Sequence, residues 1–325
     1  MFLPPWRPIS KSVTVADPNV KVLRVGLVFD VGGRGDKSFN DAAYGGLARA
    51  RDEFNFDVSY LEPAGSEDRE AAMRLFASRG FDLVIGVGFI FSSDINEVAL
   101  EYPNVRFACV DYTPSADPIP PNVAGIAFHE EEGAFLAGSI AGLLSKTEHV
   151  GFIGGMDSPI IRKFEIGYAA GVKAVCPKCI VHAAYAGGSP DAFRDPAKGK
   201  SLTISQIAAG ADVFFHASGA TGHGVFEAAH DAHAIAIGVD SDQYSEMPDT
   251  IVTSMLKRGD VAVYEIAKAV ALGNFVGGMH MLGLKEGALD FVRGEHAARL
   301  PESVIARTDE MRSEIIEGKR HVPSR

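Results

Sequence analysis

The sequence predicts an α/β protein whose strands lie in parallel sheets. From residue 23 onwards, short and almost continuous apolar runs alternate with amphipathic stretches, and strands buried on both faces of a parallel sheet have this composition. Hydrophobic residues make up 46% of the 325-residue chain and charged residues 22%, which excludes an intrinsically disordered chain and a coiled coil. At roughly 150 residues per domain, the length favours two domains.

The strands are expected at the apolar runs. The last of these runs, Ile251–Leu256, is followed directly by Lys257. Because helical stretches separate the runs, the strands are expected to pair in parallel. In chain order the other runs are Leu23–Phe29, Val58–Leu61, Leu83–Ile85, Val105–Val110, Val123–Phe128, Val150–Ile153, Ile180–Ala184, Val213–Phe215 and Ala234–Val239.

Several of the intervening helices have recognisable starts. Ser38 is placed to cap a helix over Phe39–Phe54. Ser158-Pro159 and Asp195-Pro196 each place a proline at the first helical position, where proline is favoured. The helix that begins at Asp195-Pro196 is expected to end near Ala209.

A proline-rich segment marks the expected boundary between two lobes. Thr113–Asn122 has four prolines in ten residues, which is typical of a linker rather than of a turn within a domain. A strand over Val123–Phe128 and a helix over Glu130–Leu144 would then begin the second lobe. Residues 1–20, with three prolines among the first eight, are expected to form an extended N-terminal arm.

Charge and hydropathy exclude several classes of partner. The net charge is −11, from 31 basic and 42 acidic residues, which disfavours a nucleic-acid-binding surface. No apolar run reaches the ~18 residues that would span a bilayer. The N-terminal residues also lack the apolar core of a signal peptide, which is roughly 7–15 residues long. Either the protein is cytoplasmic, or an export signal has been removed or replaced.

The three cysteines leave their pairing open. Cys109 lies in an apolar run and is expected to be a small buried hydrophobe. Cys176 and Cys179 form one C-x-x-C motif, for which unpaired structural thiols, a local disulfide, and a redox or metal site are the alternatives. A second pair of metal ligands does not follow, and a disulfide would need an oxidising compartment.

Three aspartates stand at strand ends, where ligands bind in open α/β sheets. Asp30 follows the first expected strand, Asp111 the fourth and Asp240 the ninth. Helix capping is the alternative role for such residues. No helical pattern directly follows Asp240, so we expect its carboxylate to bind a ligand, with Asp111 and Asp30 as further candidates.

No motif indicates catalysis, a cofactor or a resident metal. Gly32-Gly33-Arg34-Gly35 and Gly86-Val87-Gly88-Phe89 are not dinucleotide-binding fingerprints, and there is no Walker A sequence. Ala217-Ser218-Gly219 is not a nucleophile elbow, and His230 and His233 lack the glutamate of a zinc-protease motif. We therefore expect a binding protein without a cofactor rather than an enzyme.

Two aromatic residues and a lysine are the other binding candidates. Phe39 lies at an expected helix start and Phe193 in a polar, glycine-rich loop, and two such rings could clamp a flat ligand. Packing within the loops is the alternative for each ring. Lys257 would need a carboxylate partner if it were buried, and Asp240 is the candidate.

A series of short motifs follows one another along the chain over roughly residues 22–275. Together they resemble the basic-membrane-protein (BMP) family of lipoproteins, the PnrA-like purine nucleoside receptors. The C-x-x-C motif and the absence of a lipidation cysteine depart from the family pattern. The motifs are Val25-Gly26-Leu27-Val28-Phe29-Asp30-Val31-Gly32-Gly33, Asp36-Lys37-Ser38-Phe39-Asn40, Gly86-Val87-Gly88-Phe89, Val110-Asp111, Gly154-Gly155-Met156, Phe193-Arg194-Asp195-Pro196-Ala197-Lys198-Gly199-Lys200, Gly238-Val239-Asp240-Ser241-Asp242-Gln243 and Thr253-Ser254-Met255-Leu256-Lys257-Arg258.

The resemblance implies a type I periplasmic-binding-protein fold, in which two Rossmann-like, doubly wound lobes are joined by a three-crossover hinge. The second and third crossovers would fall near Ile251–Ser254 and around Gly287–Phe291. Each lobe would be discontinuous in sequence. Residues 21–124 and 255–287 would form the first lobe, and residues 125–254 and 288–325 the second.

The resemblance also implies a substrate-binding protein that captures a purine nucleoside (adenosine, guanosine or inosine) between its lobes and delivers it to the permease of an ABC-type importer. The base would lie between Phe39 and Phe193, and ribose hydroxyls on Asp240 and Lys257. The protein would be a monomer, periplasmic or anchored by lipid on the outer side of the cytoplasmic membrane. The residues that match the family's site are Asp30, Phe39, Asn40, Asp111, Phe193, Gly219, Asp240 and Lys257.

Other functions stay open on the sequence alone. The same fold could bind a free base, a sugar or a signalling molecule. A nucleoside hydrolase or phosphorylase is a rival, because carboxylates would stand near a ribose. A DNA-binding regulator would need a helix-turn-helix before residue 20 and a basic surface, and the sequence has neither.

Overall fold

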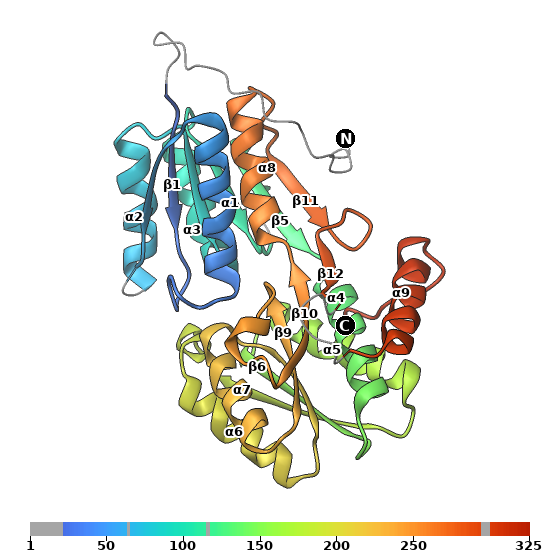
Figure 1. Cartoon of the computed structure of the whole chain (residues 1–325). Coiled ribbons are helices and arrows are strands. Elements are labelled where there is room, and N and C mark those ends of the chain that lie inside the picture. The colour runs from blue at the N-terminus through green and yellow to red at the C-terminus, as the bar shows by residue number, and fades with distance from the viewer. Residues whose placement is uncertain (1–21, 64–65, 115–117, 294–299) are drawn as a thin grey trace. The chain divides into compact units, whose positions relative to one another are not determined.

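The computed structural model describes residues 22–63, 66–114, 118–293 and 300–325, which form two compact units (Figure 1). Each unit contains one six-stranded sheet. The expected N-terminal arm and part of the expected linker lie outside the described residues. The first unit comprises the described residues up to Asp30, Ala43–Phe128 and Gly259–Leu282, and the second comprises Val31–Ala42, His129–Arg258 and the described residues from Gly283 onwards.

The sheet of the first unit is parallel throughout, in the order β11-β5-β4-β3-β1-β2. Its central strands are buried on both faces, as their apolar composition predicts. The strands are β1 (Arg24–Val28), β2 (Asp57–Leu61), β3 (Leu83–Val87), β4 (Arg106–Val110), β5 (Val123–Phe128) and β11 (Gly278–Leu282), and the helices are α1 (Phe39–Phe54), α2 (Ser66–Ser78), the short η1 (Phe89–Phe91), α3 (Ser92–Glu101) and α8 (Gly259–Ala271).

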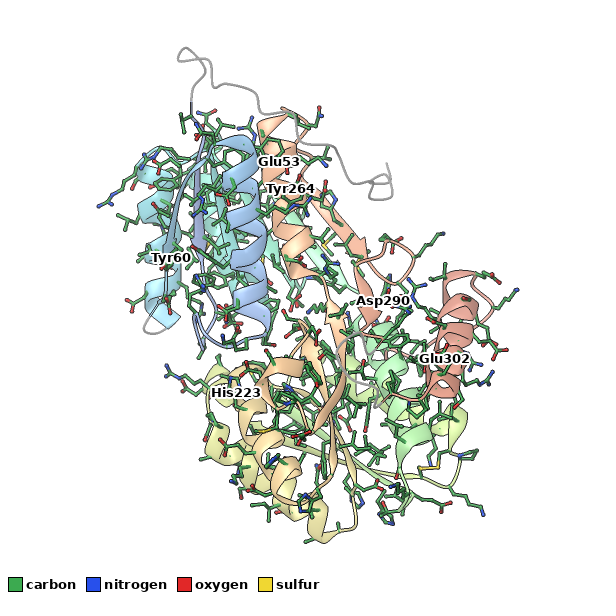
Figure 2. All side chains as sticks on the ribbon, in the orientation of Figure 1. Glu53, Tyr60, His223, Tyr264, Asp290 and Glu302 are labelled. Carbon is green, nitrogen blue, oxygen red and sulfur yellow. A yellow bond between two sulfur atoms is a disulfide. The ribbon has the colours of Figure 1, made fainter. Side chains whose placement is uncertain are left out.

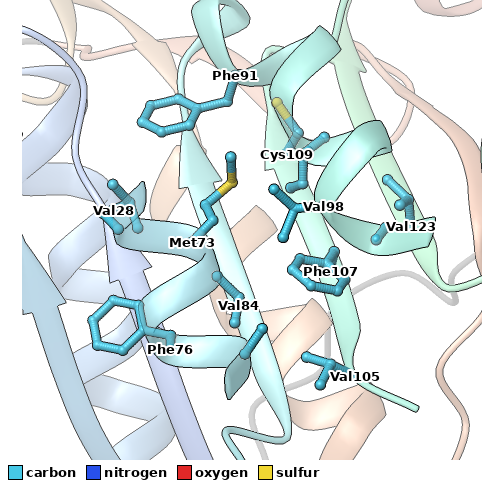
Figure 3. Close-up of a cluster of buried hydrophobic side chains, with 14 of the residues drawn as sticks. Val28, Met73, Phe76, Val84, Phe91, Val98, Val105, Phe107, Cys109 and Val123 are labelled. Carbon is cyan, nitrogen blue, oxygen red and sulfur yellow. The ribbon is translucent and has the colours of Figure 1, made fainter. Parts of the chain in front are cut away.

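Helices α2 and α3 cover one face of this sheet and enclose a core of aromatic and branched side chains (Figure 3). Cys109 lies fully buried in this core, which confirms the sequence prediction, and burial raises the pKa of its thiol. Helices α1 and α8 pack together, and the Tyr264 hydroxyl of α8 donates a 2.8 Å hydrogen bond to Glu53 of α1 (Figure 2).

The sheet of the second unit has the order β12-β10-β9-β8-β6-β7, and only its edge strand β12 is antiparallel to its neighbour. The strands are β6 (His149–Met156), β7 (Ile180–Gly187), β8 (Val213–Ala217), β9 (Ile235–Asp240), β10 (Ile251–Lys257) and β12 (Leu289–Phe291), and the helices are α4 (Glu130–Leu144), α5 (Pro159–Val175), η2 (Pro190–Phe193), α6 (Pro196–Ala208), η3 (Gly219–Thr221), α7 (Gly222–Asp231), η4 (Tyr244–Glu246) and α9 (Glu302–Ile316).

The two sheets are wound in the same way. Without their sixth, edge strands, the orders are β2-β1-β3-β4-β5 and β7-β6-β8-β9-β10, which is a doubly wound arrangement. The α/β class and the doubly wound sheets are therefore confirmed. Every strand expected from an apolar run is present within a few residues, whereas β11, β12 and α9 were not predicted.

The chain exchanges segments between the units. It passes from the second unit to the first between Arg258 and Gly259 and returns between Leu282 and Gly283, whereas we expected these passages near Ile251–Ser254 and around Gly287–Phe291. The first of them comes later because β10 keeps its full length, pairing with β9 on one side and β12 on the other.

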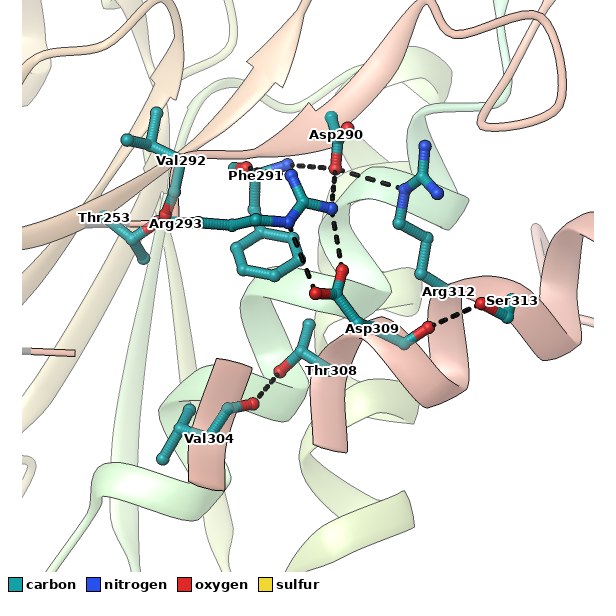
Figure 4. Close-up of polar contacts among 10 residues, drawn as sticks. All are labelled: Thr253, Asp290, Phe291, Val292, Arg293, Val304, Thr308, Asp309, Arg312 and Ser313. Atoms are coloured by element: carbon teal, nitrogen blue, oxygen red, sulfur yellow. Dashed lines mark hydrogen bonds and ion pairs between the residues drawn. The ribbon is translucent and has the colours of Figure 1, made fainter. Parts of the chain in front are cut away.

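The C-terminal segments complete the second unit. Arg293, just beyond β12, lies 3.1 Å from the Asp290 carboxylate and 2.7 Å from the Asp309 carboxylate of α9 (Figure 4). Arg312 of α9 lies 3.1 Å from the same Asp290. Charged side chains thus link α9 to the edge strand of the sheet.

Cys176 and Cys179, directly after α5, form a disulfide, with Cα atoms 5.3 Å apart. Of the alternatives left open by the C-x-x-C motif, the structure therefore contains the local disulfide. Among the described residues, no helix has both the length and the apolar composition that crossing a lipid bilayer requires.

Candidate ligand-binding site

Six of the eight expected site residues belong to the second unit. Strands β10, β9, β8 and β6 are neighbours and run in parallel, so their carboxyl ends form one edge of the sheet, where ligands bind in doubly wound folds. The six residues, from these strand ends and from the segments beside them, are Phe39, Asn40, Phe193, Gly219, Asp240 and Lys257.

Lys257 is the last residue of β10 and is almost completely buried. Its Nζ lies 5.2 Å from the centre of the Phe39 ring and 5.5 Å from that of Phe164 on α5, within the range of cation–π attraction. The same atom lies 3.4 Å from Oε1 of Glu130, the first residue of α4. A buried ammonium thus has a carboxylate and two aromatic rings around it.

Glu130 was missed by the sequence analysis. Three consecutive glutamates, Glu130 to Glu132, begin α4, and acidic residues are common there because they complement the helix dipole. Because that ordinary explanation was sufficient, the sequence did not single out Glu130, whose buried side chain lies beside Lys257. Asp240 lies on the neighbouring strand opposite Leu256, and its pairing with Lys257 stays a prediction.

Asp240 ends β9 in the left-handed region, with φ of 66°, which aspartate tolerates better than most residues. It is buried, and its carboxylate accepts a hydrogen bond from the Ser38 hydroxyl. Ser38 directly precedes Phe39 in the chain. Asp240, Phe39 and Lys257 are therefore brought together by side chains within one unit.

The expectation that Ser38 caps α1 was wrong. The first amides of the helix donate to the buried Asp36 carboxylate, from Asn40 N at 2.8 Å and from Asp41 N at 3.1 Å. Asp36 also accepts from Asn40 Nδ2 at 3.0 Å. Because Asp36 takes over the cap, the Ser38 hydroxyl is directed to Asp240 instead. Burial raises the pKa of Asp36, and the backbone hydrogen bonds oppose this rise.

Phe193 lies against two glycines at strand ends. A Cβ atom on Gly155 would stand 2.4 Å from the Phe193 ring, and one on Gly219 would stand 3.2 Å from the Phe193 carbonyl oxygen. Gly219 also has φ of 55°, which glycine adopts without strain. A Cβ atom on Gly32 would lie 3.9 Å from both Asn40 Nδ2 and the Phe193 carbonyl oxygen, so these residues share one neighbourhood.

The loop after Asp240 is held by a buried polar network. Gln243 Oε1 accepts from Val239 N at 2.8 Å, and Gln243 N donates to Ser254 Oγ at 3.0 Å. His216, at the end of β8, lies 3.3 Å from Gln243 Oε1 and 3.2 Å from Ser218 Oγ. Burial lowers the pKa of His216 to about 3, so its ring is neutral and supports the strand ends as a hydrogen-bonding group.

The other two expected residues, Asp30 and Asp111, belong to the first unit. They stand at the ends of β1 and β4, on either side of Gly88 at the end of β3. Gly88 N donates to Val110 O at 2.9 Å, and a Cβ atom on Gly88 would lie 2.3 Å from Asp30 Oδ2. Asp111 has the same φ of 66° as Asp240, so the two sheets end their fourth strands alike.

Across the described ranges, no group of three or more histidine, cysteine or acidic side chains is arranged to hold a metal ion. The candidate residues of the second unit combine aromatic rings with a few polar and charged side chains near the carboxyl edge of its sheet. Small-molecule binding sites have this composition.

Comparison with known proteins gives the family. Residues 23–325 match the family model described as ABC transporter substrate-binding protein PnrA-like. The CD4+ T-cell-stimulating antigen of Listeria innocua is 34% identical over 331 residues, which covers 95% of this chain and 90% of the relative. A lipoprotein of uncharacterised function from Pyrococcus horikoshii is 37% identical over 281 residues, covering 83% and 69%.

Among solved structures, an ABC transporter solute-binding protein from Aeropyrum pernix K1 is similar over 93% of this chain and 94% of that chain, with 32% identity and a TM-score of 0.81. This similarity confirms the periplasmic-binding-protein fold that the motifs implied. The chain belongs to the PnrA-like family of ABC transporter substrate-binding proteins.

Proposed function

We propose that the protein binds a purine nucleoside and delivers it to an ABC-type importer. The observation that carries this proposal is the cluster at the carboxyl edge of the second sheet. There the Phe39 ring lies 5.2 Å from the buried Lys257 ammonium, and Ser38, the residue before Phe39, donates to Asp240. An aromatic face, a carboxylate and an ammonium are the groups that a base joined to a sugar needs.

The aromatic residues suit the base. A purine has a broad π face, and stacking on an aromatic side chain contributes about 1–3 kcal/mol per base. Phe39 and Phe193 are both half-buried rather than enclosed in the core, which leaves part of each ring for a ligand. Asn40, with an amide that can both donate and accept, suits the edge of the base.

The charged residues suit the ribose. An ionised carboxylate such as that of Asp240 accepts hydrogen bonds from two neighbouring hydroxyls, and such charge-assisted bonds are stronger than neutral ones. The Lys257 ammonium has donors only and would serve a hydroxyl or the ring oxygen. The roles of Asp30 and Asp111 on the first unit, and the monomeric state, stay predictions.

We further propose that the protein works outside the cytoplasm. The family consists of substrate-binding proteins of ABC transporters, and one relative is named a lipoprotein. The Cys176–Cys179 disulfide supports this location, because disulfides persist in oxidising compartments.

The experiment that tests the ribose contact compares two aspartates of the same loop. Calorimetric titration with inosine should show that Asp240→Asn weakens binding by about 1.5–3 kcal/mol, the range for a hydrogen bond to a charged group. Asp242→Asn, which changes an exposed side chain two residues on, should bind as the wild type does. The wild type should bind 2′-deoxyinosine more weakly than inosine, and the loss of binding free energy should be most of the loss that Asp240→Asn causes with inosine. Equal binding of inosine by both variants would contradict the assignment.

The hydrolase or phosphorylase alternative has a direct test. The structural relative from Aeropyrum pernix K1 is a solute-binding protein, and we expect incubation with inosine, with and without phosphate, to release no hypoxanthine. Release of base at a rate that scales with protein concentration would replace the receptor function with an enzymatic one.

A further inference from the structure

Glu130 is a buried carboxylate held between two lysines. Its Oε1 lies 3.4 Å from Lys257 Nζ and its Oε2 lies 3.0 Å from Lys163 Nζ of α5. The side chain of Glu130 is 1% exposed and that of Lys257 2%, whereas that of Lys163 is 31% exposed. Oε2 of Glu130 thus pairs with the partly exposed Lys163, and Oε1 pairs with the buried Lys257 at the end of β10.

Helix α4 gives Glu130 this position. The helix begins at Glu130, directly after the chain leaves β5, and packs against β10. The first turn of a helix favours a negative side chain, so the ionised form of Glu130 is supported by the helix as well as by the two lysines. In its ionised form, the carboxylate places a negative charge beside the end of β10.

The other charged groups near Lys257 come from four directions. Arg258 follows it in the chain, and Asp240 lies on β9 opposite Leu256. On the other side, Asp290 of β12 faces Leu256 in the strand pairing, but its carboxylate lies beside Arg293 and Arg312. Lys163, from α5, shares Glu130. The Glu130 carboxylate itself lies 3.4 Å from the Lys257 ammonium.

We propose that Glu130 is a positioning residue for ligand binding, which keeps the buried Lys257 protonated and holds its ammonium at the carboxyl edge of the second sheet. This inference rests on the proposed function, in which Lys257 contacts the ligand. Burial alone would favour the neutral amine, and the rings of Phe39 and Phe164 attract only the cation. Glu130 supplies the opposite charge, and Lys163 fixes the orientation from which its Oε1 reaches Lys257.

The test reads Lys257 directly. In apo protein labelled at the lysine side chains, the NMR signal of Lys257 is assigned by its loss in Lys257→Arg and is followed as the pH is raised. In Glu130→Gln the ammonium loses its negatively charged neighbour, so Lys257 should lose its proton at a pH lower by about one unit or more. One unit is a tenfold change in the proton dissociation constant of Lys257. Inosine affinity near neutral pH should fall by about tenfold or more.

Two further variants separate charge from architecture. Glu302→Gln removes an exposed carboxylate from the first turn of α9, and it should leave both the Lys257 titration and the inosine affinity at wild-type values. Glu130→Asp keeps the charge but draws it back by one methylene. It should keep the pH at which Lys257 loses its proton closer to the wild-type value than Glu130→Gln does. If Glu130→Gln does not fold, Glu130→Asp is compared with the wild type instead.

The outcomes distinguish this inference from the proposed function. If the wild type binds inosine and Glu130→Gln changes neither quantity, the positioning role is wrong while the receptor function stands. The positioning role is also wrong if Glu130→Asp lowers the Lys257 titration as far as Glu130→Gln does. A third outcome is that neither the wild type nor any variant binds a nucleoside, while Glu130→Gln lowers the pH at which Lys257 loses its proton. In that case Glu130 does control Lys257, and the ligand is of another class.

Discussion

The ring of Phe193 lies directly on the backbone of Gly155, at the carboxyl end of β6, where a Cβ atom would come within 2.4 Å of the ring. No side chain larger than hydrogen fits between the strand and the ring without moving one of them. The glycine at this strand end is therefore explained by the position of an aromatic residue that we assign to ligand binding.

Gly155→Ala should displace the Phe193 ring. Overpacking of this kind costs about 1–3 kcal/mol of unfolding free energy, and the displaced ring should weaken nucleoside binding by at least about tenfold. Gly188→Ala is the matched control in the loop before Phe193, because a Cβ atom there meets nothing within 4 Å. Calorimetry and thermal unfolding of both variants check the prediction. Unchanged affinity in Gly155→Ala would show that the ring's position does not matter.

Removing either aromatic ring should weaken binding of the base. Phe39→Ala and Phe193→Ala are each expected to cost about 1–3 kcal/mol of purine nucleoside affinity, the value of one stacking contact. Tyr60→Ala removes an exposed aromatic ring of β2 (Figure 2) and should cost nothing. Isothermal titration with adenosine and inosine measures the three effects. If neither phenylalanine variant binds more weakly than Tyr60→Ala, the base does not stack on these rings.

His216 should make the protein less stable in acid. Burial lowers its folded-state pKa from 6.5 to about 3. Above pH 6.5 the ring is neutral in both states and contributes no pH dependence. As the pH falls from 6.5 towards 3, His216 becomes protonated in the unfolded chain but stays neutral in the folded protein. Stability should therefore fall by up to about 1.4 kcal/mol per pH unit from this group alone.

Urea unfolding between about pH 4 and pH 7 measures this slope. His216→Gln should flatten it, whereas His230→Gln, which changes a half-exposed ring on α7, should keep the wild-type slope. Equal slopes in His216→Gln and the wild type would mean that His216 already accepts a proton in the folded state.

The cysteines should react in three steps. Native protein is expected to expose no reactive thiol, because Cys109 is buried and burial raises its pKa. Denaturation without reductant should release one thiol, and reduction should release the two from Cys176 and Cys179 as well. Thiol titration of protein secreted into an oxidising compartment checks this order. Three thiols on denaturation alone would contradict the disulfide.

Much of the fold could be predicted because local signals agreed with it. The expected helices Phe39–Phe54 and Glu130–Leu144 have those bounds in the structure, since each follows a polar start and keeps its apolar face. The buried strands appeared as apolar runs for the same reason. Strand β12 could not be found in this way, because its three residues are ordered by pairing with β10 rather than by their own composition.

The site was harder to predict, since its contacts join distant parts of the chain. The resemblance to a family named the candidate residues, but it did not show that Asp36 would cap α1 and leave Ser38 for Asp240. Nor did it show that Glu130 would lie beside Lys257. Both contacts depend on which of several neighbouring polar side chains is buried in the folded protein. The spacing of residues in the sequence does not predict this. The C-x-x-C motif likewise allowed a disulfide without requiring one.

Nucleoside binding is measured most simply by calorimetric titration of wild-type protein that has been stripped of ligand by unfolding and refolding. Adenosine, guanosine and inosine are compared with hypoxanthine and ribose. At least one nucleoside should bind in a one-to-one complex and bind more tightly than the free base or the sugar, because both Phe39 and Asp240 contribute. Binding of ribose or hypoxanthine alone, with no binding of any nucleoside, would contradict it.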